Sequence, residues 1–130
     1  MELYNIAYNQ ALRVIMRNPT IGAGRSKMVA VVYDSSGQLI SFGFNQYKSH
    51  PLQARFADHP DKIFLHAEID AIANSIRTYR GINSARLLSE SSLYVFRFNK
   101  DGTTGMAKPC LGCQRAIRAF DIKSVFWSGE

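Results

Sequence analysis

Residues 66–68, His-Ala-Glu, together with residues 109–113, Pro-Cys-Leu-Gly-Cys, carry most of the recognisable chemistry in this sequence. One His and two Cys can supply three ligands to a catalytic zinc ion and leave the fourth tetrahedral position open to water. Zinc brings the pKa of a bound water toward about 7, and Glu68 could accept that proton and hand it on. The two stretches therefore predict hydrolytic attack on an electrophilic carbon.

The Cys pair has two other interpretations. Cys110 and Cys113 could form a thioredoxin-like redox pair or one half of a structural zinc site. The redox interpretation has little support, because the pair follows a long turn and begins with Pro-Cys. The interpretation as a structural zinc site does not explain Glu68, since such a site needs no proton shuttle.

The composition is that of an ordinary globular protein. The chain has 130 residues, 46% of them hydrophobic and 20% charged, which predicts one domain over residues 1–130. The net charge of +6 favours anionic partners such as nucleotides or nucleic acid, although it could also be only a basic surface. There are two Cys, no signal-peptide pattern and no apolar run near the roughly 20 residues of a membrane span. We expect a cytoplasmic protein that does not enter the membrane.

Hydrophobic spacing predicts alternating helices and strands. Helices are expected at 2–17, 64–79 and 110–120, and strands at 28–33, 38–44, 92–98 and 122–127. Residues 45–63 are interpreted as a long loop with a helical turn at 52–57, and residues 81–91 as a linker. The order α-β-β-α-β-α-β ends in a parallel crossover, so we predict an α/β fold of three α/β/α layers around a central mixed sheet.

This layout brings the two chemical stretches to helix openings. His66 and Glu68 would lie in the first turn of one helix, and Cys110 and Cys113 in the first turn of another. Residues three apart on a helix share a face, so both Cys can point at one ion. The positive ends of two helix dipoles would meet there and favour thiolates.

The joint pattern H-x-E…P-C-x-x-C is the signature of zinc-dependent deaminases. On these residues the chain resembles the cytidine deaminase-like superfamily, whose members remove an amino group from a cytosine, adenine or guanine ring. The resemblance runs from the first predicted helix to the last strand. It implies the three-layer fold and a Zn²⁺ cofactor. The roles that it implies are zinc binding by His66, Cys110 and Cys113, proton transfer by Glu68, base contacts beside Ala67 and Pro109, and a sugar or base contact by Asn45.

Asn45 also has a simpler interpretation, as a turn residue that ends a strand. Free-nucleoside cytidine deaminases use a third Cys where this chain has His66. The His and the sequence after Cys113 instead resemble the deoxycytidylate and tRNA adenosine deaminase branch. Small phage-encoded deoxycytidylate deaminases look most similar, and in that case the location is the host cytoplasm. Two departures are the long turn at 99–108 and the missing strand and helix after residue 129. An exposed sheet edge favours homo-oligomers.

Substrate selection is predicted to depend on the loop after Asn45. Lys48, His50 and Arg55 are candidates to bind a phosphate, although each could be a solvated surface charge. Lys108 and Arg115 lie close to the Cys pair in sequence.

We therefore predict hydrolytic deamination of a pyrimidine nucleotide, dCMP or CMP, to dUMP or UMP by zinc-bound hydroxide. An alternative is deamination of cytosine or adenine within single-stranded DNA or tRNA, with Tyr47 and Phe56 as stacking aromatics beside the basic residues. A second alternative is a non-catalytic zinc-binding module.

Overall fold

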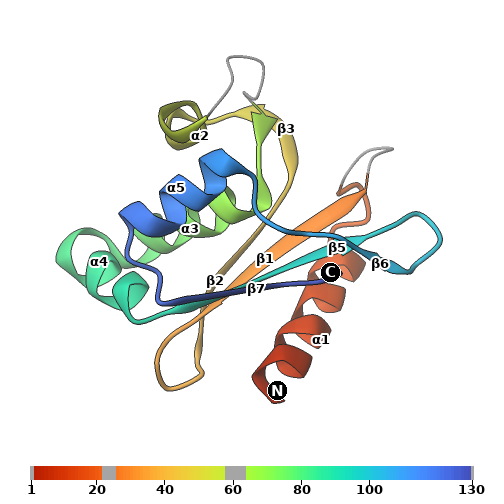
Figure 1. Ribbon diagram of the computed structural model, residues 1–130, viewed down its shortest axis with the longest axis horizontal. Coiled ribbons are helices and arrows are strands. Elements are labelled where there is room, and N and C mark those ends of the chain that lie inside the picture. Colours follow the sequence, from red (N-terminus) through yellow and green to blue (C-terminus); the bar gives the residue numbers. More distant parts are fainter. Residues whose placement is uncertain (1, 22–25, 58–63, 130) are drawn as a thin grey trace.

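The computed structural model describes residues 2–21, 26–57 and 64–129. Helices lie on both faces of a central sheet (Figure 1). The elements in chain order are α1 (Glu2–Arg17), β1 (Lys27–Tyr33), β2 (Leu39–Phe44), β3 (Gln46–Ser49), α2 (Pro51–Phe56), β4 (Phe64–Leu65), α3 (Ala67–Tyr79), α4 (Gly81–Ser89), β5 (Ser92–Phe98), β6 (Thr104–Gly105), α5 (Leu111–Ala119) and β7 (Ser124–Trp127).

The central sheet is mixed, as predicted. β1 lies between β2 and β5 and is antiparallel to both. β7 runs parallel to β5 along Ser92–Val95, so β5, α5 and β7 form the predicted crossover. β6 pairs antiparallel with the far end of β5, at Arg97 and Phe98. β3 and β4 form a separate two-stranded sheet.

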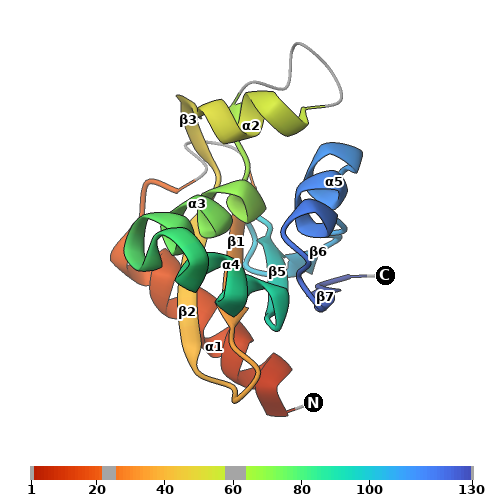
Figure 2. The same ribbon diagram turned by 90° about the vertical axis from the view of Figure 1, so that its left-hand side faces the viewer.

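Burial on both faces of β1 produces the three layers. Val29 and Val31 face α1, where Ala7, Ala11 and Val14 are buried at helical spacing. The alternate β1 residues, Ala30 and Val32, belong to the core formed with α3 and α5. Burying each of these valine side chains contributes about 1.5–3 kcal/mol to folding. Figures 1 and 2 show α1 on one side of the sheet and α3 and α5 on the other.

Gly43 allows α3 to lie directly on β2. A Cβ atom at Gly43 would be 2.3 Å from the backbone N of Ala71 and 2.7 Å from the carbonyl oxygen of Ala67. Ser41 Oγ donates a hydrogen bond of 2.8 Å to the Ala71 carbonyl in the same region. The start of α3 is thereby fixed against the sheet.

Ser128 forms hydrogen bonds both to β5 and to the segment that precedes the Cys pair. Its N–H donates to the Val95 carbonyl at 3.0 Å, and its carbonyl accepts from Ala107 N at 3.0 Å. Its Oγ accepts from Arg97 N at 3.0 Å and donates to the Gly105 carbonyl at 2.7 Å. Ser128 thus connects the predicted long turn at 99–108 to the sheet, with two hydrogen bonds to the turn and two to β5.

Several predicted boundaries were wrong. α3 begins at Ala67 rather than at residue 64, because Phe64 and Leu65 pair with β3. The predicted linker at 81–91 is mostly the helix α4. The predicted loop at 45–63 contains β3 and α2, and the expected helical turn at 52–57 matches α2. Residues 22–25 and 58–63 of the predicted connections lie outside the described residues. In the part of the chain that the structure describes, no helix has the length and apolar character needed to cross a membrane.

Candidate metal centre

Three side chains from two helix openings converge at one point. His66 Nδ1 lies 3.4 Å from Cys113 Sγ and 3.6 Å from Cys110 Sγ. The ligand atoms of the three residues all lie within 4.8 Å of one another. Tetrahedral zinc with Zn–S of about 2.3 Å and Zn–N of about 2.05 Å requires N···S separations of about 3.5 Å. The donor set therefore fits a zinc ion.

The backbone explains why His66 and Cys110 turn toward this point. Each is the N-cap residue of its helix with an extended conformation, φ −84° and ψ 155° for His66 and φ −69° and ψ 171° for Cys110. Neither uses its side chain to cap the helix. Both side chains thus lie at the positive ends of helix dipoles, which favours anionic sulfur. The predicted placement of His66 and Cys110 inside the first helical turn was wrong by one position.

The two thiols share their electrostatic environment. Hydrogen bonds with Cys113 and His66 lower the pKa of Cys110 to about 3. The hydrogen bond with Cys110, followed by burial, raises the pKa of Cys113. The Cys110 thiol therefore ionises readily, whereas ionisation of Cys113 as well is unfavourable. A divalent cation would offset that repulsion, so the chemistry of the donors also fits zinc.

Glu68 is buried beside this group, with 4% of its surface exposed. Burial is the main reason why its pKa is raised, to about 6, and its side chain interacts with Cys113. Glu68 is the second residue of α3, whereas His66 precedes the helix. Because only Glu68 has helical geometry, the two side chains are not held on opposite faces of α3, and both reach the same site. This carboxyl group can hold or release a proton next to the three ligand atoms.

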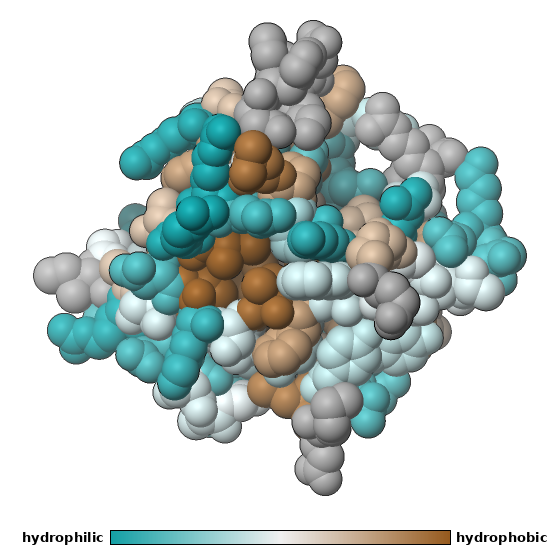
Figure 3. Space-filling view, viewed as in Figure 1, coloured by the Kyte–Doolittle hydropathy of each residue, from teal (hydrophilic) through white to brown (hydrophobic). Residues whose placement is uncertain are grey.

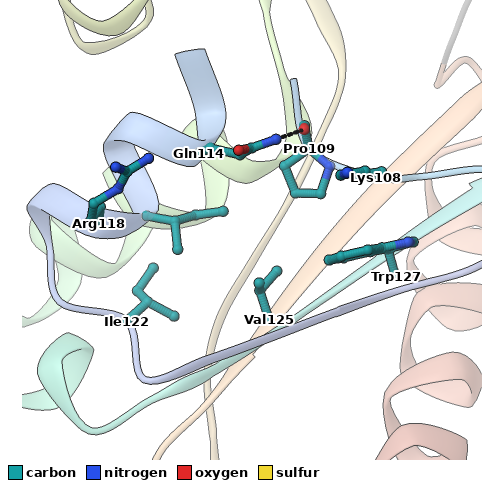
Figure 4. A pocket seen from close by; sticks show the side chains of 8 residues that line it. Lys108, Pro109, Gln114, Arg118, Ile122, Val125 and Trp127 are labelled. Carbon is teal, nitrogen blue, oxygen red and sulfur yellow. Dashed lines mark hydrogen bonds between the residues drawn. The ribbon is translucent and has the colours of Figure 1, made fainter. Parts of the chain in front are cut away.

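Ala67 and Pro109 are buried and adjoin the candidate ligands His66 and Cys110 in sequence. The carbonyl of Pro109 accepts a hydrogen bond of 2.8 Å from Gln114 Nε2 (Figure 4). Asn45 joins the ends of β1 and β2: its Oδ1 accepts from Met28 N at 3.0 Å and its Nδ2 donates to the Ser26 carbonyl at 3.1 Å. These bonds account for Asn45 structurally, and its contact with a sugar or base stays a prediction.

The predicted phosphate-binding residues lie on β3 and α2. Lys48 is exposed, and its charge lowers the pKa of Asp70, which burial raises more strongly. His50 caps α2, with Nδ1 accepting a hydrogen bond of 3.0 Å from Leu52 N. The guanidinium carbon of Arg55 lies 5.2 Å from the centre of the Phe56 ring. The structure thus gives His50 and Arg55 local roles besides the predicted one.

A hollow lies between α5 and β7 (Figures 3 and 4). Its volume is about 310 Å³, with an apolar floor that includes Ile117, Ile122 and Val125. Lys108, which is close to the Cys pair in sequence, lines this hollow, with Nζ 6.0 Å from the centre of the Trp127 ring.

Sequence reasoning missed two residues that contact the metal-binding segments. Gln53 on α2 has 1% of its surface exposed, and its Oε1 accepts a hydrogen bond of 3.0 Å from His66 N. Gly112 lies between the two Cys, where a Cβ atom would be 2.6 Å from the Phe56 carbonyl oxygen. The glycine in the C-L-G-C stretch was the only available signal, because nothing in the sequence marks Gln53 as buried.

Comparison with known proteins agrees with this geometry. A family model described as the cytidine and deoxycytidylate deaminase zinc-binding region matches residues 4–128. A comparison with curated protein sequences found no match.

Proposed function

The chain belongs to the cytidine and deoxycytidylate deaminase zinc-binding family, and from this premise we propose that it deaminates a cytosine-type mononucleotide. The proposed reactions are dCMP to dUMP and CMP to UMP, carried out by residues 1–130 as a single zinc-dependent domain. Zinc-dependent deamination itself is supported by the family and by the His66, Cys110 and Cys113 group.

The chemistry follows from the side chains at the centre. His66, Cys110 and Cys113 would hold zinc, which when bound makes water a hydrolytic nucleophile at neutral pH. Glu68 would accept the two protons of the attacking water in turn and deliver one to the ring nitrogen N3 and the other to the amino nitrogen of the base. The C4–N bond then breaks, ammonia leaves, and oxygen from water stays on C4.

The observation that carries this proposal is the buried carboxyl group of Glu68 beside the three convergent ligand atoms. A zinc ion that only stabilised the fold would not need a further carboxyl group beside its ligands, and burying that group costs free energy. The second alternative, a non-catalytic zinc-binding module, therefore receives less support.

A nucleotide substrate is favoured by the basic charge of the chain. The net charge of +6 attracts anions in general, and Lys48, His50 and Arg55 offer cations or donors on the β3–α2 segment. In this proposal the backbone beside Ala67 and Pro109 binds the amino-bearing edge of the base, and Asn45 the sugar or base.

A base within single-stranded DNA or tRNA is the second candidate substrate, and one observation favours it. Tyr47 on β3 and Phe64 on β4 meet edge to face, with ring centres 5.6 Å apart. They are 48% and 39% exposed, and β4 directly precedes His66. Exposed aromatics beside basic residues can stack on successive bases.

The test is a deamination screen with purified, zinc-loaded protein. Substrates would be dCMP, CMP, deoxycytidine, cytidine, adenosine and short single-stranded oligonucleotides. We expect the highest kcat/KM for dCMP, loss of turnover on zinc removal, and recovery when zinc is returned. Turnover of oligonucleotides alone, with an affinity that falls steeply as salt rises, would replace the mononucleotide proposal with the second candidate.

Three finer assignments are also proposed. Similarity to small phage-type deoxycytidylate deaminases and a cytoplasmic location rest on the sequence pattern and on the use of Cys as metal ligands. Self-association rests on β7, which pairs on one side with β5 and has no partner on its other side among the described strands. Sedimentation of the purified protein would test it, and a monomer at all concentrations would contradict it.

A further inference from the structure

The short helix α2 contacts the openings of both metal-binding helices. It lies beside the ends at which α3 and α5 begin (Figures 1 and 2). Leu52 and Phe56 pack against the core that α3 and α5 share. The Phe56 ring also meets Phe120, at the end of α5, edge to face at 6.2 Å.

On the α3 side, the contact is a hydrogen bond to the backbone of the predicted zinc ligand His66. Gln53 Oε1 accepts from His66 N at 3.0 Å, and Gln53 is almost completely buried. N–H groups at the start of a helix lack intrahelical acceptors, so an external acceptor fixes their direction. Since His66 is extended at that point, this bond fixes the peptide plane from which the imidazole projects.

On the α5 side, the contact is a close backbone approach. The Phe56 carbonyl oxygen would be 2.6 Å from a Cβ atom at Gly112, and Ala57 Cα would be 3.4 Å from it. Gly112 is in the first turn of α5, between Cys110 and Cys113. The end of α2 therefore rests on the turn that presents both sulfur atoms.

We propose that Gln53 is a positioning residue for the zinc ligand His66, and that α2 holds the His66 and Cys-pair halves of the centre in register. This proposal depends on zinc binding by His66, Cys110 and Cys113. It does not depend on which base the protein deaminates, and Gln53 acts in it only through its hydrogen bond with the His66 backbone. Residues that orient metal ligands typically contribute about 10–100-fold to metal affinity.

The test compares zinc affinity, by competition with a chelator, in the wild type, Gln53→Met and Leu52→Met. Gln53→Met keeps the length of the side chain and removes the acceptor, while Leu52→Met changes packing in the same helix. We expect zinc affinity about 10–100-fold lower in Gln53→Met and unchanged within about threefold in Leu52→Met. A folded Gln53→Met protein with wild-type affinity would overturn the proposal.

A second measurement reports on geometry. With Co²⁺ in place of zinc, the visible absorption bands respond to ligand arrangement, and we expect them to shift in Gln53→Met but not in Leu52→Met. If Gln53→Met does not fold, the zinc affinity of Gln53→Glu tests the proposal. A carboxylate oxygen at this position can still accept the hydrogen bond from His66 N. Near wild-type zinc affinity in Gln53→Glu supports the proposal, and a loss of tenfold or more overturns it. Neither measurement uses turnover, so failure of the deaminase proposal would be seen separately.

Discussion

Nδ1 of His66 lies 3.6 Å from Sγ of Cys110, although 44 positions separate the two residues. The chain between them forms α3, α4, β5 and β6, and the two residues meet because α3 and α5 begin at the same place. Both are extended residues just ahead of a helix, and neither side chain makes a capping hydrogen bond to its helix. A loss of either residue should therefore affect the metal more than the fold.

The first prediction concerns zinc content. His66→Ala and Cys110→Ser should each reduce bound zinc from about one per chain to a small fraction, because two remaining ligands hold the ion weakly. Metal analysis after gel filtration measures this. His50→Asn is the matched control, since Asn can still cap α2 and His50 is not a predicted ligand. Equal zinc content in His66→Ala and the wild type would exclude His66 as a ligand.

The second prediction separates metal binding from turnover. Glu68→Gln should keep zinc and lower kcat by at least about 10²-fold, because an amide cannot accept and return a proton. Asp70→Asn changes another buried acid of the same helix and should keep most activity. Steady-state deamination and metal analysis of the same samples test both. Unchanged kcat in Glu68→Gln would remove Glu68 from the mechanism.

The third prediction concerns the contact of α3 with β2. Gly43→Ala would place a methyl group 2.3 Å from Ala71 N, so helix and strand must separate. We expect a loss of about 3 kcal/mol or more in the free energy of unfolding, at the upper end for overpacked cores. Urea denaturation measures it. The control Gly37→Ala has free space around it but φ +88°, and should cost only about 1–2 kcal/mol.

The fourth prediction is a pH dependence of stability that arises from Asp70. Burial raises the pKa of this carboxyl group, which accepts hydrogen bonds from Phe44 N at 3.1 Å and Gln46 Nε2 at 2.9 Å. Because the folded pKa is above the unfolded value of about 3.9, ionisation costs stability. That cost is absent below the unfolded pKa and grows as pH rises through the folded pKa. Asp70→Asn should remove it, so its stability relative to wild type should increase with pH.

Unfolding of zinc-free protein by urea across this pH range measures the difference. Asp34 provides a control of opposite sign, since hydrogen bonds from Gln38 N and the Ser36 side chain lower its pKa. The stability that Asp34 contributes is present above its unfolded pKa and is lost as pH falls through its folded pKa. Asp34→Asn should therefore lose stability relative to wild type as pH rises. A constant difference between Asp70→Asn and wild type would contradict the role given to Asp70.

The fifth prediction tests phosphate recognition. Lys48→Ala and Arg55→Ala should each raise KM for dCMP more than KM for deoxycytidine, because only dCMP carries the phosphate. Lys100→Ala is the control, an exposed cation in the turn between β5 and β6. Equal changes for both substrates would show that Lys48 and Arg55 do not bind phosphate. The change in KM would then be explained by the loss of local contacts, such as that of Arg55 with Phe56.

The central sheet and the grouping of His66 with the Cys pair could be predicted because they leave local signals. Continuous β-branched runs mark β1, and β5 was predicted at its observed limits, Ser92–Phe98. The parallel pairing of β7 followed from a strand, a helix and a strand in succession. Chemistry singled out His66 and the Cys pair without any knowledge of the fold.

Other features depend on tertiary contacts that leave no such signal. β4 has two residues and exists only through pairing with β3, so Phe64 and Leu65 were assigned to the following helix. α4 begins at Gly81, after Arg80 with φ 53°, and Gly-containing polar sequence at that point is typical of linkers. The role of Gln53 requires the loop to fold back over His66, which no spacing predicts.

The bonds of Ser128 have a consequence for the order in which the protein is assembled. A chain that has emerged from the ribosome as far as Cys113 already contains all three predicted zinc ligands. It lacks Ser128, whose backbone and hydroxyl groups hold Gly105 and Ala107 against β5. The segment ahead of Pro109 therefore gains its final support only after β7 has been added to the sheet. We expect zinc to enter late, into a nearly finished fold, so that loading with metal completes folding rather than starting it.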